Sequence, residues 1–342
     1  MTAAFRLGIV GAGYIAGVVA RAMRDVPNGQ VTAVASRRRE SADEFAAEYS
    51  VENVFNTWQE LVASDAVDAV YVATPTDVRE EVAVAAAQHG KHVLGDKPFA
   101  NLDSLQRIIA ACRANGVAFM DATHFTHHPR TAQIRRELAE RVGTVGGIRS
   151  AFFFPNDDRS NIRYNPVKEP TGAFGDMVWY NMRAIVEYTP DDAELVDSSG
   201  YFQRDAVTGA VVRLSGVLRL SNGCLSTWDA GYTVGNLVMD LNLMGERGVI
   251  SMDDYILDWE TIPPLPTPGY PVSFTQRKGV ANPQGYTQIP TPSARSQSTL
   301  MMINFAAICG NPTGDAAEAS IRRAERTQGL LDSVWPTLKE IN

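Results

Sequence analysis

A glycine-rich segment near the start of the chain has the residue types and spacing that bind a pyrophosphate. It reads G-A-G-Y-I-A over Gly11–Ala16 and directly follows the apolar stretch Arg6–Val10. After a strand, the first glycine allows a tight turn, the second lets the backbone approach the phosphates, and a small third residue lets helix and strand pack. The N-terminus of the helix adds free N–H groups and a positive dipole end. The residues predicted to contact a dinucleotide are Gly11, Gly13, Tyr14, Ile15 and Ala16.

Arginines follow the second apolar stretch, Val31–Ala35, and they bear on which dinucleotide binds. An acidic residue at this strand end binds the ribose of NAD, whereas basic residues bind the 2′-phosphate of NADP. The chain has no carboxylate there; Ser36 offers a hydroxyl, and Arg37 and Arg38 offer charge-assisted hydrogen bonds. The pattern favours NADP, with NAD as the second option. The alternative is that these arginines only begin a solvated, basic helix.

Two later segments place polar and basic residues at the ends of apolar stretches. One is Thr74-Pro75-Thr76, and the other is Gly90–Pro98, which reads G-K-H-V-L-G-D-K-P. Together with the glycine-rich segment they resemble the Gfo/Idh/MocA oxidoreductases, the family of glucose-fructose oxidoreductase and inositol dehydrogenase. In that family one strand end reads T-P-x, and a later one reads G-K-H-V followed by E-K-P. The order and the spacing match.

The resemblance continues over nearly the whole chain. Gly172–Tyr180 reads G-A-F-G-D-M-V-W-Y and is similar to the family's glycine-rich stretch that ends D-x-G-x-H or D-x-G-x-Y. Met120–Arg130 looks like a branch related to dihydrodiol dehydrogenases and sugar dehydrogenases. Three positions depart from the family pattern: Asp96 replaces a Glu, Arg79 stands where many members carry a His, and Val178 replaces a glycine.

The resemblance implies a Rossmann domain followed by an α/β domain, with the nicotinamide at the carboxyl ends of the parallel strands. Lys97 would face the substrate oxygen, and Tyr180 would stand beside it. Chemistry agrees, because hydride transfer to or from a C–OH carbon needs a proton partner on oxygen. Asp176 would orient Lys97 or bind a sugar hydroxyl, or it would instead cap the helix that starts near it. The implied cofactor contacts on this side are Thr74, Pro75, Thr76, Lys97 and Pro98.

Hydrophobic periodicity indicates the elements that position these residues. Apolar stretches that alternate with amphipathic ones predict βαβ units and a doubly wound parallel sheet over residues 1–122. Helices are expected at Val82–His89 and Leu102–Asn115, each followed by a glycine that can end a helix. The expected strands are Arg6–Val10, Val31–Ala35, Ala69–Ala73, Lys91–Leu94 and Val117–Met120.

Residues 123–342 have a different pattern and are expected to form a substrate-binding and oligomerisation domain. After a helix near Thr131–Arg141, alternating apolar and polar residues predict a large, mostly antiparallel sheet with one apolar face. The proline-rich residues 263–292 should form a long loop. Helices at Ser296–Cys309 and Asp315–Lys339 would cover the sheet or pack on the first domain. The apolar rows are Val212, Leu214, Leu218 and Leu220, and Leu237, Met239, Leu241 and Leu243.

Composition excludes several classes of protein. The 342 residues carry 31 Lys+Arg against 39 Asp+Glu, and this net charge of −8 argues against a nucleic-acid or anionic-membrane binder. Three separated cysteines fit reduced thiols, and no apolar stretch approaches the roughly 20 residues that span a bilayer. We therefore expect a cytoplasmic protein. His124, His127 and His128 lack a nearby fourth ligand, so no metal is expected.

These features predict an NADP-preferring dehydrogenase or reductase that acts on a carbonyl or secondary alcohol of a sugar, cyclitol or diol, with Lys97 and Tyr180 handling the proton. Two alternatives stay open: a non-catalytic NAD(P)-binding regulator, and an enzyme that recycles a tightly bound cofactor within each turnover. A homodimer or homotetramer is expected, paired through the open face of the second sheet. The apolar rows motivate this pairing, although one row must also face its own helices.

Overall fold

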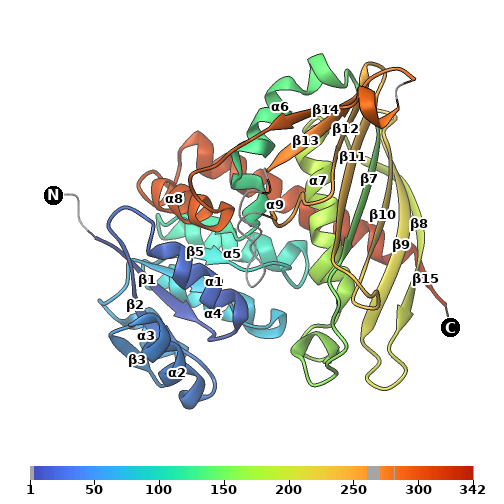
Figure 1. The fold of residues 1–342 in the computed structure, drawn as a ribbon. Coiled ribbons are helices and arrows are strands. Elements are labelled where there is room, and N and C mark those ends of the chain that lie inside the picture. The colour runs from blue at the N-terminus through green and yellow to red at the C-terminus, as the bar shows by residue number, and fades with distance from the viewer. Residues whose placement is uncertain (1–3, 260–269, 271, 281, 342) are drawn as a thin grey trace. The chain divides into compact units, whose positions relative to one another are not determined.

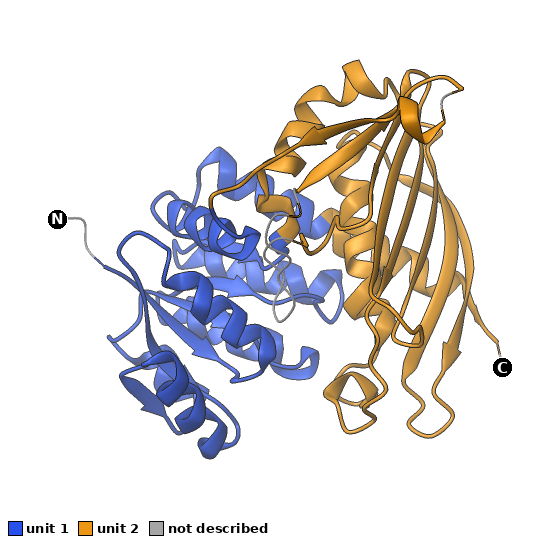
Figure 2. Cartoon of the chain, in the orientation of Figure 1, with its two compact units in different colours: residues 1–124, 295–325 blue, residues 125–294, 326–342 orange. Residues whose placement is uncertain are grey.

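Two compact units make up the chain. The structure is a computed structural model that describes residues 4–259, 270, 272–280 and 282–341. The first unit consists of residues 1–124 and 295–325, and the second of residues 125–294 and 326–342 (Figure 2). Each unit therefore combines segments that are far apart in the sequence.

The first unit is built on a six-stranded parallel sheet in the order β3-β2-β1-β4-β5-β6 (Figure 1). This confirms the doubly wound α/β fold, and the five expected strands lie within two residues of their expected ends. The unexpected β3 has three half-buried residues, too few for a periodicity signal. The strands are β1 (Phe5–Val10), β2 (Gly29–Ala35), β3 (Asn53–Phe55), β4 (Ala69–Val72), β5 (His92–Gly95) and β6 (Phe119–Asp121).

Local sequence explains where the helices of this unit begin. At α3, the Thr57 hydroxyl accepts the N–H of Glu60 and the Glu60 carboxylate accepts the N–H of Thr57, a reciprocal capping box. At α5, Asn101 caps the N–H of Ser104. The helices are α1 (Tyr14–Met23), α2 (Arg39–Tyr49), α3 (Trp58–Ala63), α4 (Thr76–Gln88), α5 (Leu102–Ala114), α8 (Gln297–Cys309) and the first part of α9 (Asp315–Val334).

Helix α8 completes the core of the first unit, although it lies far along the chain. It packs on α1, and Met302 and Phe305 are fully buried in the same apolar cluster as Leu7 and Val19. The ring of Phe305 meets the ring of Phe5 edge-on at 6.0 Å between centroids. The core beneath the glycine-rich segment is therefore built from two distant parts of the sequence.

The second unit is built on a nine-stranded sheet in the order β14-β13-β12-β11-β7-β10-β9-β8-β15. Neighbouring strands are antiparallel except for the β7–β10 and β8–β15 pairs, so the expected mostly antiparallel sheet is confirmed. The strands are β7 (Val145–Phe153), β8 (Leu195–Arg204), β9 (Val211–Leu220), β10 (Leu225–Gly231), β11 (Val238–Gly245), β12 (Gly248–Met252), β13 (Ser273–Arg277), β14 (Thr287–Pro290) and β15 (Leu338–Glu340). The helical elements are α6 (Pro129–Arg141), η3 (Phe174–Val178) and α7 (Trp179–Tyr188), with 3-10 turns η1 (His124–His127), η2 (Ile162–Tyr164), η4 (Pro283–Gly285) and η5 (Trp335–Thr337).

The two apolar rows face inward, not toward a partner. Their members on β9 are at most 5% exposed, and Met239, Leu241 and Leu243 are fully buried, whereas Leu237 precedes β11 and is half-buried. Helix α7 covers this face: all ten of its residues are buried, and Asn181 donates to the Ser150 hydroxyl of β7 at 2.8 Å. The expectation that these rows form the dimer surface is therefore wrong, because the chain's own helix uses them.

Two further expectations for the second half are wrong. Part of the proline-rich stretch lies outside the described residues, but the remainder contains β13, η4 and β14 rather than one loop. The sheet accepts Pro290 because β14 is its edge strand, where a missing N–H costs no ladder bond. The last helix ends at Val334 instead of Lys339, because Pro336 cannot continue it, and β15 follows.

Candidate active site

The predicted cofactor segments of the first unit all follow the carboxyl ends of parallel strands. Gly11 follows β1, Ser36 follows β2, and Asp96 follows β5. Backbone hydrogen bonds keep the ends of neighbouring strands side by side. The Gly11 N–H donates to the Ala35 carbonyl at 2.8 Å, and the Asp96 N–H donates to the Val72 carbonyl at 3.1 Å. The strand order reverses beside β1, and ligands of open α/β sheets bind at such a switch point.

The two glycines of the fingerprint, Gly11 and Gly13, differ in their backbone conformation and in the space around them. Gly11 has φ +107°, and a Cβ there would lie 2.5 Å from the carbonyl oxygen of Ala73. Gly13 is the N-cap of α1 with an extended backbone, and a Cβ there would meet nothing within 4 Å. The fold therefore requires a glycine at position 11. It does not require one at position 13, where the missing side chain leaves open space at the N-terminus of α1. Ala16 is fully buried, and Tyr14 is 64% exposed.

The arginines after β2 divide into two kinds. Arg39 is engaged, because it donates to the Asp43 carboxylate at 2.8 Å and to the Asn56 side-chain oxygen at 2.7 Å. Arg37 and Arg38 are exposed, and neither guanidinium has a hydrogen-bond or ion-pair partner among the described residues. Half-buried Ser36 lies beside them. Two cations are therefore available to an anion at this strand end.

The segments after β4 and β5 are joined by a side chain that the sequence marked only as a departure. Thr74 is buried, Pro75 precedes α4 as its N-cap, and Thr76 is the first residue of that helix. Lys97 is half-buried, its N–H donates to the Asp96 carboxylate at 2.9 Å, and a cis peptide bond joins it to Pro98. Buried Arg79 donates to the backbone carbonyls of Thr74 and Pro98.

In the second unit, Tyr180 is the second residue of a buried helix that follows a π-helical turn. Turn η3 runs directly into α7, and Val178 has ordinary helical angles there, so the position needs no glycine. Tyr180 is 6% exposed. Its ring packs against Phe152 at 5.2 Å in an edge-to-face arrangement and against Phe125 at 6.2 Å. The tyrosine is thus held in an apolar, aromatic setting.

Asp176 lies in the π turn and does not cap a helix, so that reading of the sequence is wrong: neither η3 nor α7 has a side-chain cap. Its carboxylate accepts from Arg163 Nε at 2.5 Å and from the Tyr232 hydroxyl at 3.1 Å. Burial and the charge of Asp176 raise the pKa of Tyr232 well above its ordinary value, so Tyr232 remains a donor. Arg163 and Tyr232 lie far from any motif, and no spacing signal pointed to them.

Of the three clustered histidines, His128 has a structural role at a helix start. No cluster of three or more His, Cys, Asp or Glu in the described part of the chain could hold a metal ion. His128 is instead the N-cap of α6, where its Nδ1 accepts the N–H of Arg130 at 3.0 Å. Burial, aided by the charge of Arg130, lowers the pKa of His128 to about 4, so the ring stays neutral and can accept.

In the part of the chain that the structure describes, no helix is both long and apolar enough to cross a membrane.

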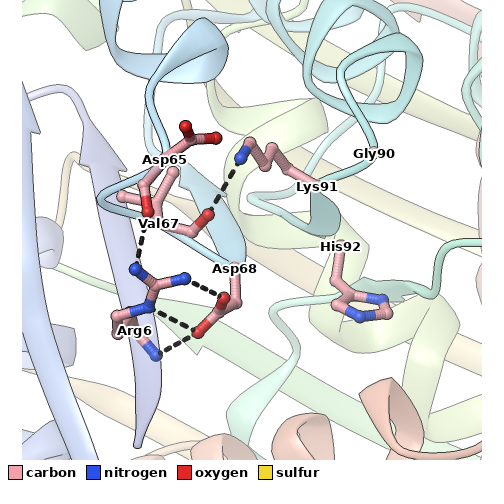
Figure 3. Close-up of a pocket in the computed structure, with 7 residues that line it drawn as sticks. All are labelled: Arg6, Asp65, Val67, Asp68, Gly90, Lys91 and His92. Carbon is pink, nitrogen blue, oxygen red and sulfur yellow. Dashed lines mark hydrogen bonds and ion pairs between the residues drawn. The ribbon is translucent and has the colours of Figure 1, made fainter.

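A cavity of about 500 Å³ lies at the opposite, amino-terminal edge of the parallel sheet (Figure 3). Three of its charged side chains, those of Arg6, Asp68 and Lys91, bond to one another or to the backbone. Arg6 contacts the Asp68 carboxylate through Nε at 3.0 Å and Nη2 at 2.5 Å, and Lys91 Nζ donates to the Val67 carbonyl at 3.0 Å. None of the predicted site residues lines it, so we do not assign the active site there.

Comparison with known proteins finds relatives of this chain. The family model described as "Oxidoreductase family, NAD-binding Rossmann fold" matches residues 5–123. The scyllo-inositol 2-dehydrogenase (NADP(+)) IolU of Bacillus subtilis (strain 168) is 40% identical over 141 residues, which are 41% of this chain and 43% of that protein. The dTDP-3,4-didehydro-2,6-dideoxy-alpha-D-glucose 3-reductase of Actinomadura kijaniata is 34% identical over 205 residues, 58% of this chain and 60% of that protein. The chain therefore spans about half the length of the curated relatives it matches.

Solved structures extend the likeness to the fold of both units. The crystal structure of KijD10, a 3-ketoreductase from Actinomadura kijaniata in complex with NADP and TDP-benzene, has a TM-score of 0.86 at 25% identity and covers 99% of each chain. The sequence match lies over the unit that carries the glycine-rich fingerprint and Lys97. Residues 5–123 are thus similar to the oxidoreductase family whose model carries the NAD-binding Rossmann fold.

Proposed function

We propose that this chain is an NADP-preferring oxidoreductase that transfers a hydride between nicotinamide and a carbonyl or secondary alcohol of a sugar, cyclitol or diol. One observation carries the proposal: the fingerprint, the basic strand end, the T-P-T segment and Lys97 all follow carboxyl ends of one parallel sheet. Cofactors of open α/β sheets bind at that edge. The names of the inositol and sugar relatives agree with this substrate class.

The residues present fit a dinucleotide. The open space at Gly13 would admit a pyrophosphate, held by N–H groups of the glycine-rich segment. The uncommitted Arg37 and Arg38, with Ser36, would bind the 2′-phosphate. The residues after β4, together with Lys97 and Pro98, would border the nicotinamide. When bound, NADPH supplies the hydride.

Lys97 and Tyr180 would manage the proton on the substrate oxygen. A lysine or tyrosine can supply or remove that proton if its protonation state suits the working pH. We propose that Asp176 binds a substrate hydroxyl, since a carboxylate accepts hydrogen bonds and Arg163 and Tyr232 hold this one in place.

Cofactor choice can be tested with matched arginine variants. Titrating NADPH and NADH by fluorescence should show tighter binding of NADPH, because each charge-assisted bond contributes about 1.5–3 kcal/mol. The double variant Arg37→Ala/Arg38→Ala should lose at least about tenfold of that preference, corresponding to one such bond. Arg39→Ala is the control, because Arg39 already binds Asp43 and Asn56. Equal affinities of the wild type for both cofactors would overturn NADP preference.

Catalysis can be tested once a cofactor-consumption screen of sugars, cyclitols and diols has found a substrate. Lys97→Met should lower turnover by about 10²–10⁴-fold, the usual effect of a positioned acid or base, and leave NADPH binding nearly unchanged. Lys91→Met makes the same change at the opposite sheet edge and should leave turnover unaffected. Tyr180→Phe should cost less than Lys97→Met if Lys97 is the principal donor. Wild-type turnover in Lys97→Met would instead favour a non-catalytic regulator.

Cofactor retention, location and assembly complete the proposal. Nicotinamide absorbance in the purified protein would indicate an enzyme that recycles a tightly bound cofactor. The three free thiols suit the cytoplasm.

We further propose that the chain forms a homodimer or homotetramer through the outer face of the second sheet, where Tyr201, Val217 and Leu225 are 40–54% exposed. Charges of both signs, among them Arg149 and Asp229, also border a cavity of about 430 Å³ on that sheet.

A further inference from the structure

Arg79 is a buried cation for which the described part of the chain supplies no anionic partner. The residue is 3% exposed, and it makes no ion pair with any carboxylate of the described residues. Within the described residues, its three hydrogen bonds all go to neutral oxygens, and its Nε has no partner. Burying an unpaired charge is costly. A residue needed only to fill space or satisfy two carbonyls would not have to be an arginine.

The hydrogen bonds of Arg79 join the segment after β4 to the segment after β5. Nη2 donates to the carbonyl of Thr74, which follows β4, at 2.5 Å. Nη1 donates to the hydroxyl of Thr76, the first residue of α4, at 3.2 Å, and to the carbonyl of Pro98, next to Lys97. A guanidinium is a planar fork whose donors keep fixed directions. One rigid guanidinium group therefore holds two backbone segments together, the one that follows β4 and the one that follows β5.

We propose that Arg79 is a positioning residue for Lys97, holding the Lys97-Pro98 backbone against the T-P-T segment so that the amine keeps its place relative to the nicotinamide and the substrate oxygen. This rests on the proposed function, because it assigns Arg79 to the step that Lys97 performs. Misplacing a catalytic group by about 1 Å can cost on the order of 10²-fold in rate.

The test compares Arg79→Met with Arg107→Met. Arg107 lies on α5 and binds Glu80, the neighbour of Arg79 on α4, but it is exposed. Arg79→Met should lower kcat about 10–100-fold, while KM for substrate and the Kd of NADPH change less than about threefold. Hydrogen exchange should rise in the peptides that contain residues 72–76 and 96–100 and stay unchanged elsewhere. Arg107→Met should change none of these. If Arg79→Met does not fold, Arg79→Lys, which keeps the charge and loses the fork, serves the same test with the same expectation.

Two results would overturn the proposal. One is wild-type kcat in Arg79→Met when Lys97→Met is inactive, which removes the positioning role but leaves the proposed function intact. The other is a loss of kcat matched by an equal loss of NADPH affinity and by faster exchange throughout the first unit, which indicates a purely structural residue. If Lys97→Met itself retains turnover, the proposed function fails first, and the exchange data still report whether Arg79 holds the segment.

Discussion

Replacing the two fingerprint glycines one at a time should separate folding from cofactor binding. Gly11→Ala puts a side chain at φ +107° and 2.5 Å from the Ala73 carbonyl oxygen. The backbone conformation costs about 1–2 kcal/mol, and the overlap costs about 1–3 kcal/mol more. At about 2–4 °C per kcal/mol, the unfolding temperature should fall by about 4–20 °C.

Gly13→Ala should change the stability little and weaken the binding of NADPH strongly. Its backbone is extended and the added methyl meets nothing within 4 Å, so the loss is limited to N-cap preference, about 0.5–1 kcal/mol. The methyl would occupy space that the pyrophosphate needs. Losing one charge-assisted bond corresponds to about 1.5–3 kcal/mol, or roughly 10–100-fold in the Kd of NADPH.

Thermal unfolding and fluorescence titration of NADPH, run on both variants and the wild type, give the two readouts. A Gly13→Ala variant that binds NADPH with the wild-type Kd would refute the placement of the pyrophosphate. A Gly11→Ala variant with an unchanged unfolding temperature would refute the reasoning from φ and the Ala73 contact.

Three other predictions follow from burial and exposure. The pKa of His128 lies near 4 when folded and 6.5 is its ordinary value, so the unfolded chain takes up a proton first as the pH falls. The free energy of unfolding should therefore decline between about pH 6.5 and 4 by up to roughly 3 kcal/mol, and denaturant melts of His128→Asn, which keeps a capping oxygen, should show a shallower decline. Val217→Lys should turn an oligomer into monomers in light scattering, and a wild-type monomer at micromolar concentration would contradict the assembly. Burial raises the pKa of Cys112 to about 12 and of Cys224 to about 11, so a thiol reagent at pH 8 should label neither thiol until the protein unfolds.

Local signals were enough to predict the parallel sheet and the residues that follow its strands. Strands covered on both faces form short continuous apolar runs, and β4 is an example, with all four residues buried. The apolar row on β11 was also recognisable, because alternation specifies a half-buried strand. What alternation could not specify is the element that covers the apolar face, since that depends on where α7 packs.

Contacts between distant residues account for most of what was missed. Asp176 looked like a helix cap because it precedes a helical stretch, yet Arg163 and Tyr232 hold its carboxylate. Arg79 was visible only as a departure from the family pattern; its bond to Pro98 spans 19 residues. Strand β14 was hidden by its prolines, which an edge position tolerates.

The discontinuous core of the first unit has a consequence for how the chain is made. Residues 5–123 leave the ribosome well before α8, by about 10–35 s at roughly 5–20 residues per second. During that interval the face of α1 that packs on Met302 and Phe305 has no cover. The first unit therefore cannot finish folding while the second unit is being synthesised, unlike an N-terminal domain with a continuous sequence. A nascent chain stalled before residue 297 should thus be a substrate for chaperones, and a fragment cut after residue 124 should aggregate rather than fold.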